Sequence, residues 1–142
     1  MIIITGGAGF IGSVLLWKLN ELGRKDILLV DQNAQGSAKW ANAQKHPFES
    51  YLESTDFIAR LEMGEFNGCV DAVFHMGACS STTEMDTAYL RENNSLYSER
   101  IARWCIDQKV YLSYASSAAT YGAGEQSFSD EDALTPKLKP LN

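Results

Sequence analysis

The sequence predicts an α/β fold, a doubly wound parallel sheet with helices on both of its faces. Two observations carry this prediction. Short apolar runs alternate along the chain with segments of helical periodicity, and these runs are apolar at nearly every position, which is typical of strands buried on both faces. A cluster of glycines also stands where the first run gives way to the first helical segment. The length of 142 residues, with 45% hydrophobic and 21% charged residues, fits one globular domain.

The elements follow in a regular order. The first helix is indicated by apolar residues at helical spacing and by Gly23 as its stop. Small and polar residues from 32 to 46 predict a surface loop with one short helical piece, and those from 77 to 83 and from 121 onward predict loops. The expected strands are 2–4, 27–30, 48–52, 70–75 and 110–115, of which 48–52 is the weakest. The expected helices are 10–22, 55–63 and 86–108.

The sequence ends in Lys139-Pro140-Leu141-Asn142 without a final helix to cover the last expected strand. An open parallel edge with nothing packed on it is unusual in a finished domain. We therefore expect residues 1–142 to be a single domain that is truncated at its C-terminal end, with the substrate domain absent. Poor solubility in isolation is the expected consequence.

Charge and cysteine content exclude several functional classes. The 12 basic and 18 acidic residues give a net charge of −6, so we expect no nucleic-acid partner and no membrane surface. No run of 18 apolar residues occurs, which argues against a membrane span. Three cysteines, Cys69, Cys79 and Cys105, without CxxC spacing predict neither a disulfide framework nor a metal site, and favour the cytoplasm. Any phosphate ligand must then be held by backbone dipoles.

The glycine cluster meets this requirement. Gly6 permits a tight turn after the strand, Gly9 lets the backbone approach a pyrophosphate, and Gly12 lets the helix pack close to the strand. The N–H groups of the first helical turn then face the phosphates. Asp31 follows 19 residues after Gly12, at the end of the second strand, where a carboxylate can accept the ribose hydroxyls of an adenosine. The pattern predicts a Rossmann-type dinucleotide site; the plainer alternative is a strand-to-helix turn with Asp31 capping a loop.

The motifs also resemble a known family. Residues 5–12, Thr-Gly-Gly-Ala-Gly-Phe-Ile-Gly, have the GxxGxxG spacing of the extended short-chain dehydrogenases/reductases, and residues 75–80 and 114–122 agree with it. The chain thus resembles the nucleotide-sugar epimerases and dehydratases of that family. Within it, residues 77–84, followed by Asp86 and Asn93-Asn94, are similar to the epimerases of ADP-heptose. The resemblance runs nearly from end to end.

The resemblance implies NADP as cofactor, with NAD as the alternative, and it assigns residues to each part of it. Phe10 and Ile11 would lie against the pyrophosphate, and Asp31 with Gln32 would meet the adenosine ribose. Lys39 would neutralise a 2′-phosphate, while Ser54 stands where relatives carry a second Lys. The nicotinamide side would be lined by Met76, Gly77, Ala78, Cys79, Ser80 and Asn93.

The reaction implied by the resemblance is inversion at C6 of the heptose of ADP-glycero-manno-heptose, by transient oxidation and re-reduction, in the synthesis of lipopolysaccharide core precursors. Ser117 would be the catalytic hydroxyl. The family also uses a Tyr-x-x-x-Lys pair as its base, and no Tyr of this chain has a Lys four residues later. We therefore expect the chain to bind nucleotide and to be inactive alone, and the full-length protein to be a homo-oligomer.

Several alternatives stay open at the level of sequence. The protein could be a 4-epimerase or 4,6-dehydratase of another nucleotide sugar, or a non-catalytic NAD(P)-binding module; a reading frame that continues into Tyr-x-x-x-Lys would exclude the module. Ser117 could be an ordinary turn hydroxyl. His75, without further ligands at metal-binding spacing, is expected to be a hydrogen-bonded core or cleft histidine. Cys79 has no base beside it in the sequence and is expected to be chosen for its size.

Overall fold

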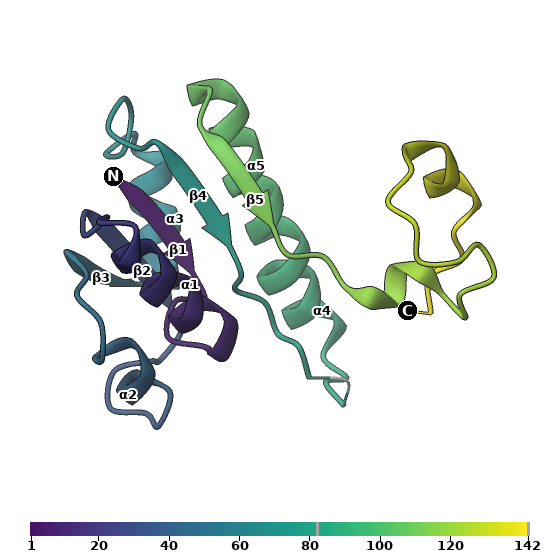
Figure 1. Ribbon diagram of the computed structural model, residues 1–142, viewed down its shortest axis with the longest axis horizontal. Helices are drawn as coiled ribbons and strands as arrows, with labels where there is room; N and C mark the ends of the chain where they lie inside the picture. The colour runs from purple at the N-terminus through teal and green to yellow at the C-terminus, as the bar shows by residue number, and fades with distance from the viewer. Residues whose placement is uncertain (82, 142) are drawn as a thin grey trace.

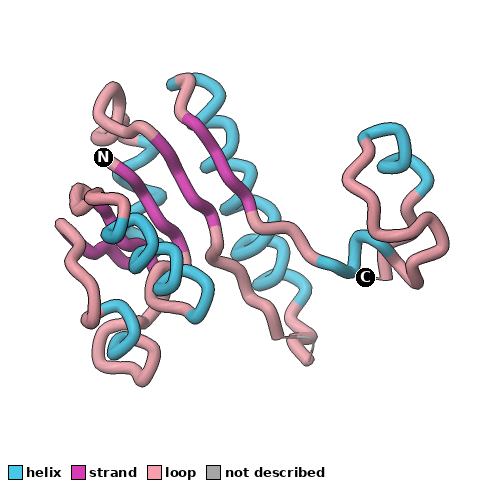
Figure 2. Tube along the Cα trace, in the orientation of Figure 1, coloured by secondary structure: helices cyan, strands magenta, loops and turns pink. Residues whose placement is uncertain are grey.

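The computed structural model describes residues 1–81 and 83–141. Its centre is one parallel sheet with the order β3-β2-β1-β4-β5 (Figures 1 and 2). The chain moves outward from β1 to β3 and then crosses back to β4, so the connection reverses between β1 and β4. The predicted doubly wound sheet is confirmed. Its strands are β1 (Ile2–Thr5), β2 (Ile27–Asp31), β3 (Ser50–Glu53), β4 (Ala72–His75) and β5 (Tyr111–Tyr114).

Helices cover the two faces of this sheet. One face packs against α1 (Phe10–Glu21) and α2 (Trp40–Ala43), and the other against α3 (Ser54–Glu62) and α5 (Tyr97–Gln108) (Figure 1). The short helical piece expected within residues 32–46 is α2. The long helix expected from 86 to 108 runs from α4 (Thr87–Leu90) through a π-helical segment, Arg91–Leu96, into α5.

Both faces of β1 are buried, which is why its sequence shows no polar alternation. Ile3 faces the cluster formed with α3 and α5, whereas Ile2 and Ile4 face the cluster formed with α1. All three isoleucines are at most 4% exposed. The strand therefore sits at the centre of the fold and fixes where the glycine loop begins.

Strand ends differ slightly from the expected ones. β3 ends at Glu53 rather than at residue 52, because its pairing with β2 runs from Leu28 as far as Asp31. β4 begins at Ala72 rather than at residue 70. Asp71 lies just before the strand, at the amino edge of the sheet. Its carboxylate accepts from Arg24 Nη2 at 2.7 Å and from the Met1 ammonium at 3.1 Å.

The segment after β5 stands apart from the sheet as a small lobe (Figure 1). It contains two 3₁₀ segments, Ala118–Tyr121 and Asp132–Lys137, the second of which lies within the loop expected from residue 121 onward. The Leu141 N–H donates to the Ala119 carbonyl at 3.0 Å, which closes the lobe on itself. β5 is the edge strand, and Tyr114 at its end is 57% exposed. Within the described ranges no helix has the length and apolar character needed to cross a membrane.

Two isoleucines of α5 give a test of the packing on this sheet. Ile101 is fully buried against the sheet, whereas Ile106 is 74% exposed. We expect Ile101→Ala to lower the free energy of unfolding by about 2–5 kcal/mol through lost burial and a residual cavity. Ile106→Ala should change it by about 0.5 kcal/mol or less. Urea unfolding followed by circular dichroism measures both, and equal losses would contradict the orientation of α5.

Candidate functional site

The glycine loop joins β1 to α1 in a tight turn. Gly6 has a φ of +66°, which an L side chain rarely adopts. The Gly9 N–H donates to the Gly6 carbonyl at 3.0 Å, and the Ser13 N–H begins the helix by donating to Gly9 at 2.9 Å. A Cβ on Gly12 would overlap the carbonyl oxygen of Gly6. The helix can approach the strand this closely only with glycine at that position.

The first turn of α1 is open to an anion. Gly9 is its N-cap residue, and no described side chain caps it. The turn carries no acidic residue, and Phe10 and Ile11 are 82% and 64% exposed. The first N–H groups of a helix lack partners within the helix and lie at the positive end of its dipole. Backbone amides arranged in this way are suited to binding an anionic group.

A second backbone meets the glycine loop at the point of strand reversal. A Cβ on Gly6 would lie 2.7 Å from both the Cα and the N of Gly77, and one on Gly77 would lie 2.9 Å from the N of Gly6. The loops after β1 and β4 therefore touch backbone to backbone. Gly77, predicted to line the cofactor, is also required for this contact.

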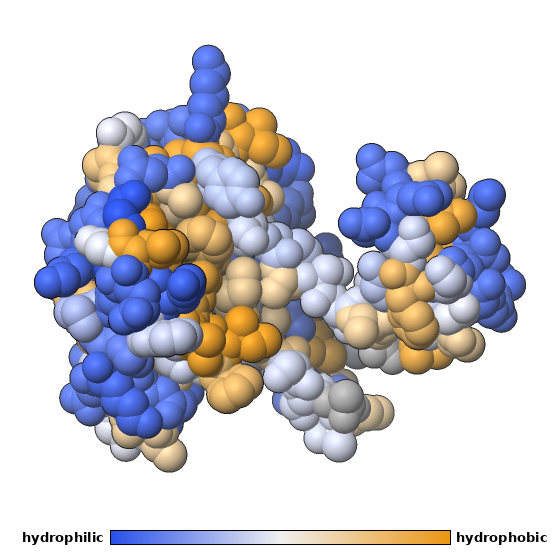
Figure 3. Space-filling view, in the orientation of Figure 1, coloured by the Kyte–Doolittle hydropathy of each residue, from blue (hydrophilic) through white to orange (hydrophobic). Residues whose placement is uncertain are grey.

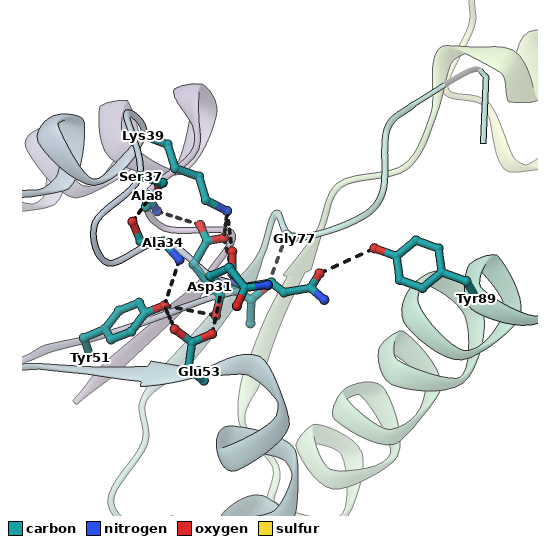
Figure 4. A network of polar contacts seen from close by, with 12 residues as sticks. Ala8, Asp31, Ala34, Ser37, Lys39, Tyr51, Glu53, Gly77 and Tyr89 are labelled. Carbon is teal, nitrogen blue, oxygen red and sulfur yellow. Dashed lines mark hydrogen bonds and ion pairs between the residues drawn. The ribbon is translucent and has the colours of Figure 1, made fainter. Parts of the chain in front are cut away.

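Asp31 is 8% exposed, and its carboxylate is held within the protein (Figure 4). It accepts from the Ala8 N–H at 2.9 Å and from the Gln32 N–H at 2.7 Å. The Lys39 ammonium lies 2.6 Å from Asp31 Oδ1 and donates to the Gln32 carbonyl at 2.7 Å. The structure thus brings together three of the predicted residues, Asp31, Gln32 and Lys39, and ties them to the glycine loop.

Glu53 adds a second carboxylate beside this cluster and was not predicted (Figure 4). It accepts from the Asn33 N–H at 2.8 Å and from the Tyr51 hydroxyl at 2.7 Å. Burial, and next the neighbouring Glu53, raise the pKa of Tyr51 above its usual range, so the phenol keeps its proton and donates. The signal that could have found Glu53 is the pairing of strand ends, since it is the register partner of Asp31.

His75 links the end of β1 to α5 through an ordered chain of hydrogen bonds. Ser98 donates its hydroxyl proton to the Asn94 carbonyl at 2.5 Å, so its oxygen accepts from His75 Nε2 at 2.8 Å. Nδ1 is then the acceptor of the Thr5 hydroxyl at 2.5 Å, and Thr5 accepts from the Gly77 N–H at 3.2 Å. Burial lowers the pKa of His75 to about 4. The expected hydrogen-bonded core histidine is confirmed.

Asn94 holds the loop after β4, a role that the sequence had not assigned. Its side chain accepts from the Cys79 N–H at 2.8 Å and donates to the Cys79 carbonyl at 3.0 Å. Asn93, the predicted residue, donates instead to the side-chain oxygen of Asn94 at 2.9 Å. Both asparagines lie in the π-helical segment. The Asn93-Asn94 pair in the sequence was the available signal.

The remaining predicted residues lie around this loop or beyond it. Met76 and Cys79 are half-buried, Ala78 and Ser80 are exposed, and Thr82 of the same run lies outside the described residues. Tyr89 of α4 reaches across to Gln32, with 3.4 Å between the hydroxyl and Oε1 (Figure 4). Ser117 is exposed and accepts from the Ala119 N–H at 3.2 Å. This contact lies within its own turn, so its catalytic role stays a prediction.

Comparison with known proteins decides the family. A model of the NAD dependent epimerase/dehydratase family matches residues 2–142. The chain belongs to this family. The resemblance that its motifs indicated is therefore confirmed.

Relatives of this epimerase/dehydratase chain include a protein named ADP-L-glycero-D-manno-heptose-6-epimerase from Nitratidesulfovibrio vulgaris (strain DP4), 49% identical over 142 residues. That match covers 100% of this chain and 44% of the relative. The Helicobacter pylori enzyme of the same name superimposes with a TM-score of 0.69 and 27% identity, over 85% and 40% of the two chains. UDP-glucose 4-epimerase from Brucella ovis in complex with NAD superimposes with a TM-score of 0.63 and 26% identity. This match covers 86% of this chain and 37% of that chain. The chain spans less than half of each relative.

Gly12→Ala tests the glycine loop of this family member. The added methyl group must displace α1 from β1, so we expect the free energy of unfolding to fall by about 1–3 kcal/mol and the affinity for nicotinamide dinucleotides to fall at least about tenfold. Ser13→Ala, the next position of the same turn, adds no atoms and should bind nearly as well. Fluorescence titration with NADH and NADPH measures the affinity; unchanged binding by Gly12→Ala would contradict the binding role of the glycine loop.

The buried histidine gives a prediction about pH. The pKa of His75 is lowered from 6.5 in the unfolded chain to about 4 in the fold. Above pH 6.5 the His75 ring is neutral in both the folded and the unfolded chain, and no stability is lost. Between pH 6.5 and about 4 the ring takes up a proton in the unfolded chain first. Stability should therefore fall across that window by up to about 3 kcal/mol.

The difference between the native chain and His75→Asn isolates this contribution. Urea unfolding of both proteins at a series of pH values should give curves that converge as the pH falls, because the variant lacks the titrating ring. Curves that stay parallel from pH 7 to pH 4 would show that His75 does not titrate in this way.

Proposed function

We propose that these residues are the nicotinamide-dinucleotide-binding part of an enzyme that inverts C6 of the heptose in ADP-glycero-manno-heptose. The observation that carries the binding function is the open first turn of α1 at the reversal point between β1 and β4. The substrate class rests on the relative that is 49% identical over the whole chain and bears that name.

The family supports a nicotinamide dinucleotide as the proposed cofactor. The residues of the site support how this cofactor would bind. The loop at Gly6, Gly9 and Gly12 would receive the pyrophosphate, with Phe10 and Ile11 over it. Asp31, Gln32 and Lys39 would meet the adenosine ribose. NADP is the form that the resemblance implies, and NAD is the alternative. When bound, such a cofactor supplies an acceptor and donor of hydride.

The loop after β4 would form the nicotinamide side of the cleft. The Asn94 side chain fixes the backbone of Cys79, and His75 with Thr5 fixes that of Gly77. Ser117 would hydrogen-bond the reacting oxygen of the substrate. No Tyr of this chain precedes a Lys by four residues, so the chain would lack the base that takes the hydroxyl proton and would not turn over by itself.

A second candidate in the same family is epimerisation at C4 of another nucleotide sugar. The likeness to UDP-glucose 4-epimerase from Brucella ovis favours it. Cytoplasmic location, a homo-oligomeric full-length protein and a role in lipopolysaccharide core precursor synthesis belong to the same proposal. A non-catalytic dinucleotide-binding module is the alternative from another class.

Native mass spectrometry tests the binding part of the proposal, and proton NMR of the nucleotide sugar tests the turnover, because two C6 epimers have the same mass. We expect the 142-residue chain to bind one nicotinamide dinucleotide and to leave ADP-heptose unchanged, because the base is missing. The polypeptide that the gene encodes, where it is longer, should carry the same nucleotide and convert ADP-heptose to its C6 epimer. Conversion of a UDP-sugar instead would favour the second candidate. Binding without any turnover by the full gene product would favour the module.

A further inference from the structure

Tyr89 and Gln32 extend towards one another at the carboxyl edge of the sheet (Figure 4). Gln32 directly follows β2, and Tyr89 belongs to α4, which follows β4. The Tyr89 hydroxyl donates to Gln32 Oε1 at 3.4 Å. Because β1 lies between β2 and β4 in the sheet, this contact crosses the end of β1, where the glycine loop begins. It joins the segments on the two sides of that loop.

The backbone at each end of the contact is held by other hydrogen bonds. The Gln32 N–H donates to Asp31 Oδ1 at 2.7 Å, and the Gln32 carbonyl accepts from the Lys39 ammonium at 2.7 Å. The Tyr89 N–H donates at 2.9 Å to the carboxylate of Asp86, the N-cap residue of α4. The contact between the two segments can therefore open by rotation of side chains alone.

The contact itself is weaker than its anchors. It is a single neutral hydrogen bond, longer than most hydrogen bonds between a hydroxyl and a carbonyl group. Gln32 is exposed and Tyr89 is half-buried. Burial, and next the neighbouring Cys79, raise the pKa of Tyr89, so the phenol keeps its proton and donates at neutral pH. A weak contact between firmly held segments can open and close without unfolding either segment.

We propose that Tyr89 and Gln32 form a latch over the glycine loop, which opens when a nicotinamide dinucleotide enters or leaves and closes again once it is bound. This inference rests on the proposed dinucleotide function, in which the pyrophosphate lies at the start of α1 and the adenosine ribose at the end of β2. The contact joins the segments on either side of β1, so a ligand that occupies both places has to pass it.

Slow exchange of the cofactor suits the proposed reaction. A cofactor that accepts a hydride from the substrate and returns it to the same substrate ends each cycle in its starting form. It does not have to leave between cycles. A latch that slows entry and exit therefore does not slow this reaction, and it retains the cofactor between the two hydride transfers.

Stopped-flow fluorescence of the 142-residue chain tests the latch, with NADH or NADPH, whichever binds more tightly. Tyr89→Phe removes the hydroxyl and keeps the ring. Because opening of the latch is part of the barrier in both directions, the association and dissociation rate constants should each rise about two- to fivefold. Their ratio, the dissociation constant, should change by less than about 1.5-fold. Tyr111→Phe removes the same hydroxyl from an exposed tyrosine at the amino end of β5 and should change neither rate.

A substitution of the other partner tests whether the two side chains act together. Gln32→Met removes the amide and keeps the length of the side chain. Tyr89→Phe made in this background should change neither rate further, because the hydroxyl has already lost its acceptor. Thermal melting of each variant confirms that it is folded before the rates are measured.

The outcomes separate the two proposals. A change in one rate alone or in neither rate, or a further acceleration by Tyr89→Phe in the Gln32→Met background, overturns the latch and leaves the dinucleotide function standing. Failure of the folded native chain to bind either nucleotide overturns the dinucleotide function, and the latch with it.

Discussion

The backbones of Gly6 and Gly77 meet where β1 and β4 end, and the relative position of the two following loops depends on that contact. Either residue with a Cβ would push the two loops apart, since the added atom would lie less than 3 Å from the opposite backbone. The contact sets how close α1 lies to the loop after β4. The contact lies at the strand reversal between β1 and β4, which is where open α/β sheets bind ligands.

Hydrogen bonds between polar groups hold the two loops together at this contact. Thr5 stands beside Gly6, accepts from the N–H of Gly77 and donates to His75. His75 hydrogen-bonds to Ser98 on α5, and Asn94 in the π-helical segment before α5 hydrogen-bonds to Cys79. A neutral imidazole suits this position because it donates from one nitrogen and accepts at the other. Backbone approach and side-chain network thus stabilise one placement of the loop.

The parts of the fold that local chemistry determines could be predicted from the sequence. Apolar runs located the strands, and glycines at 6, 9 and 12 located the loop, because burial and close approach restrict residue type directly. Glu53 was missed because its importance depends on pairing between strands, and the expected strand stopped one residue short of it. The role of Asn94 was missed because its contacts with Cys79 join two segments that are 15 residues apart in the sequence. Neither feature is encoded within a few neighbouring residues.

The acidic character of the chain contrasts with the start of α1. The net charge is −6, whereas the first turn of this helix carries no acidic residue, and its N–H groups lie at the positive end of the helix dipole. The ends of β2 and β3 differ from that turn, because they place Asp31 and Glu53 side by side, with Lys39 bound to Asp31. Lys39 offsets only one of the two carboxylates. The local charges therefore favour an anion at the start of α1 and disfavour one at the ends of β2 and β3.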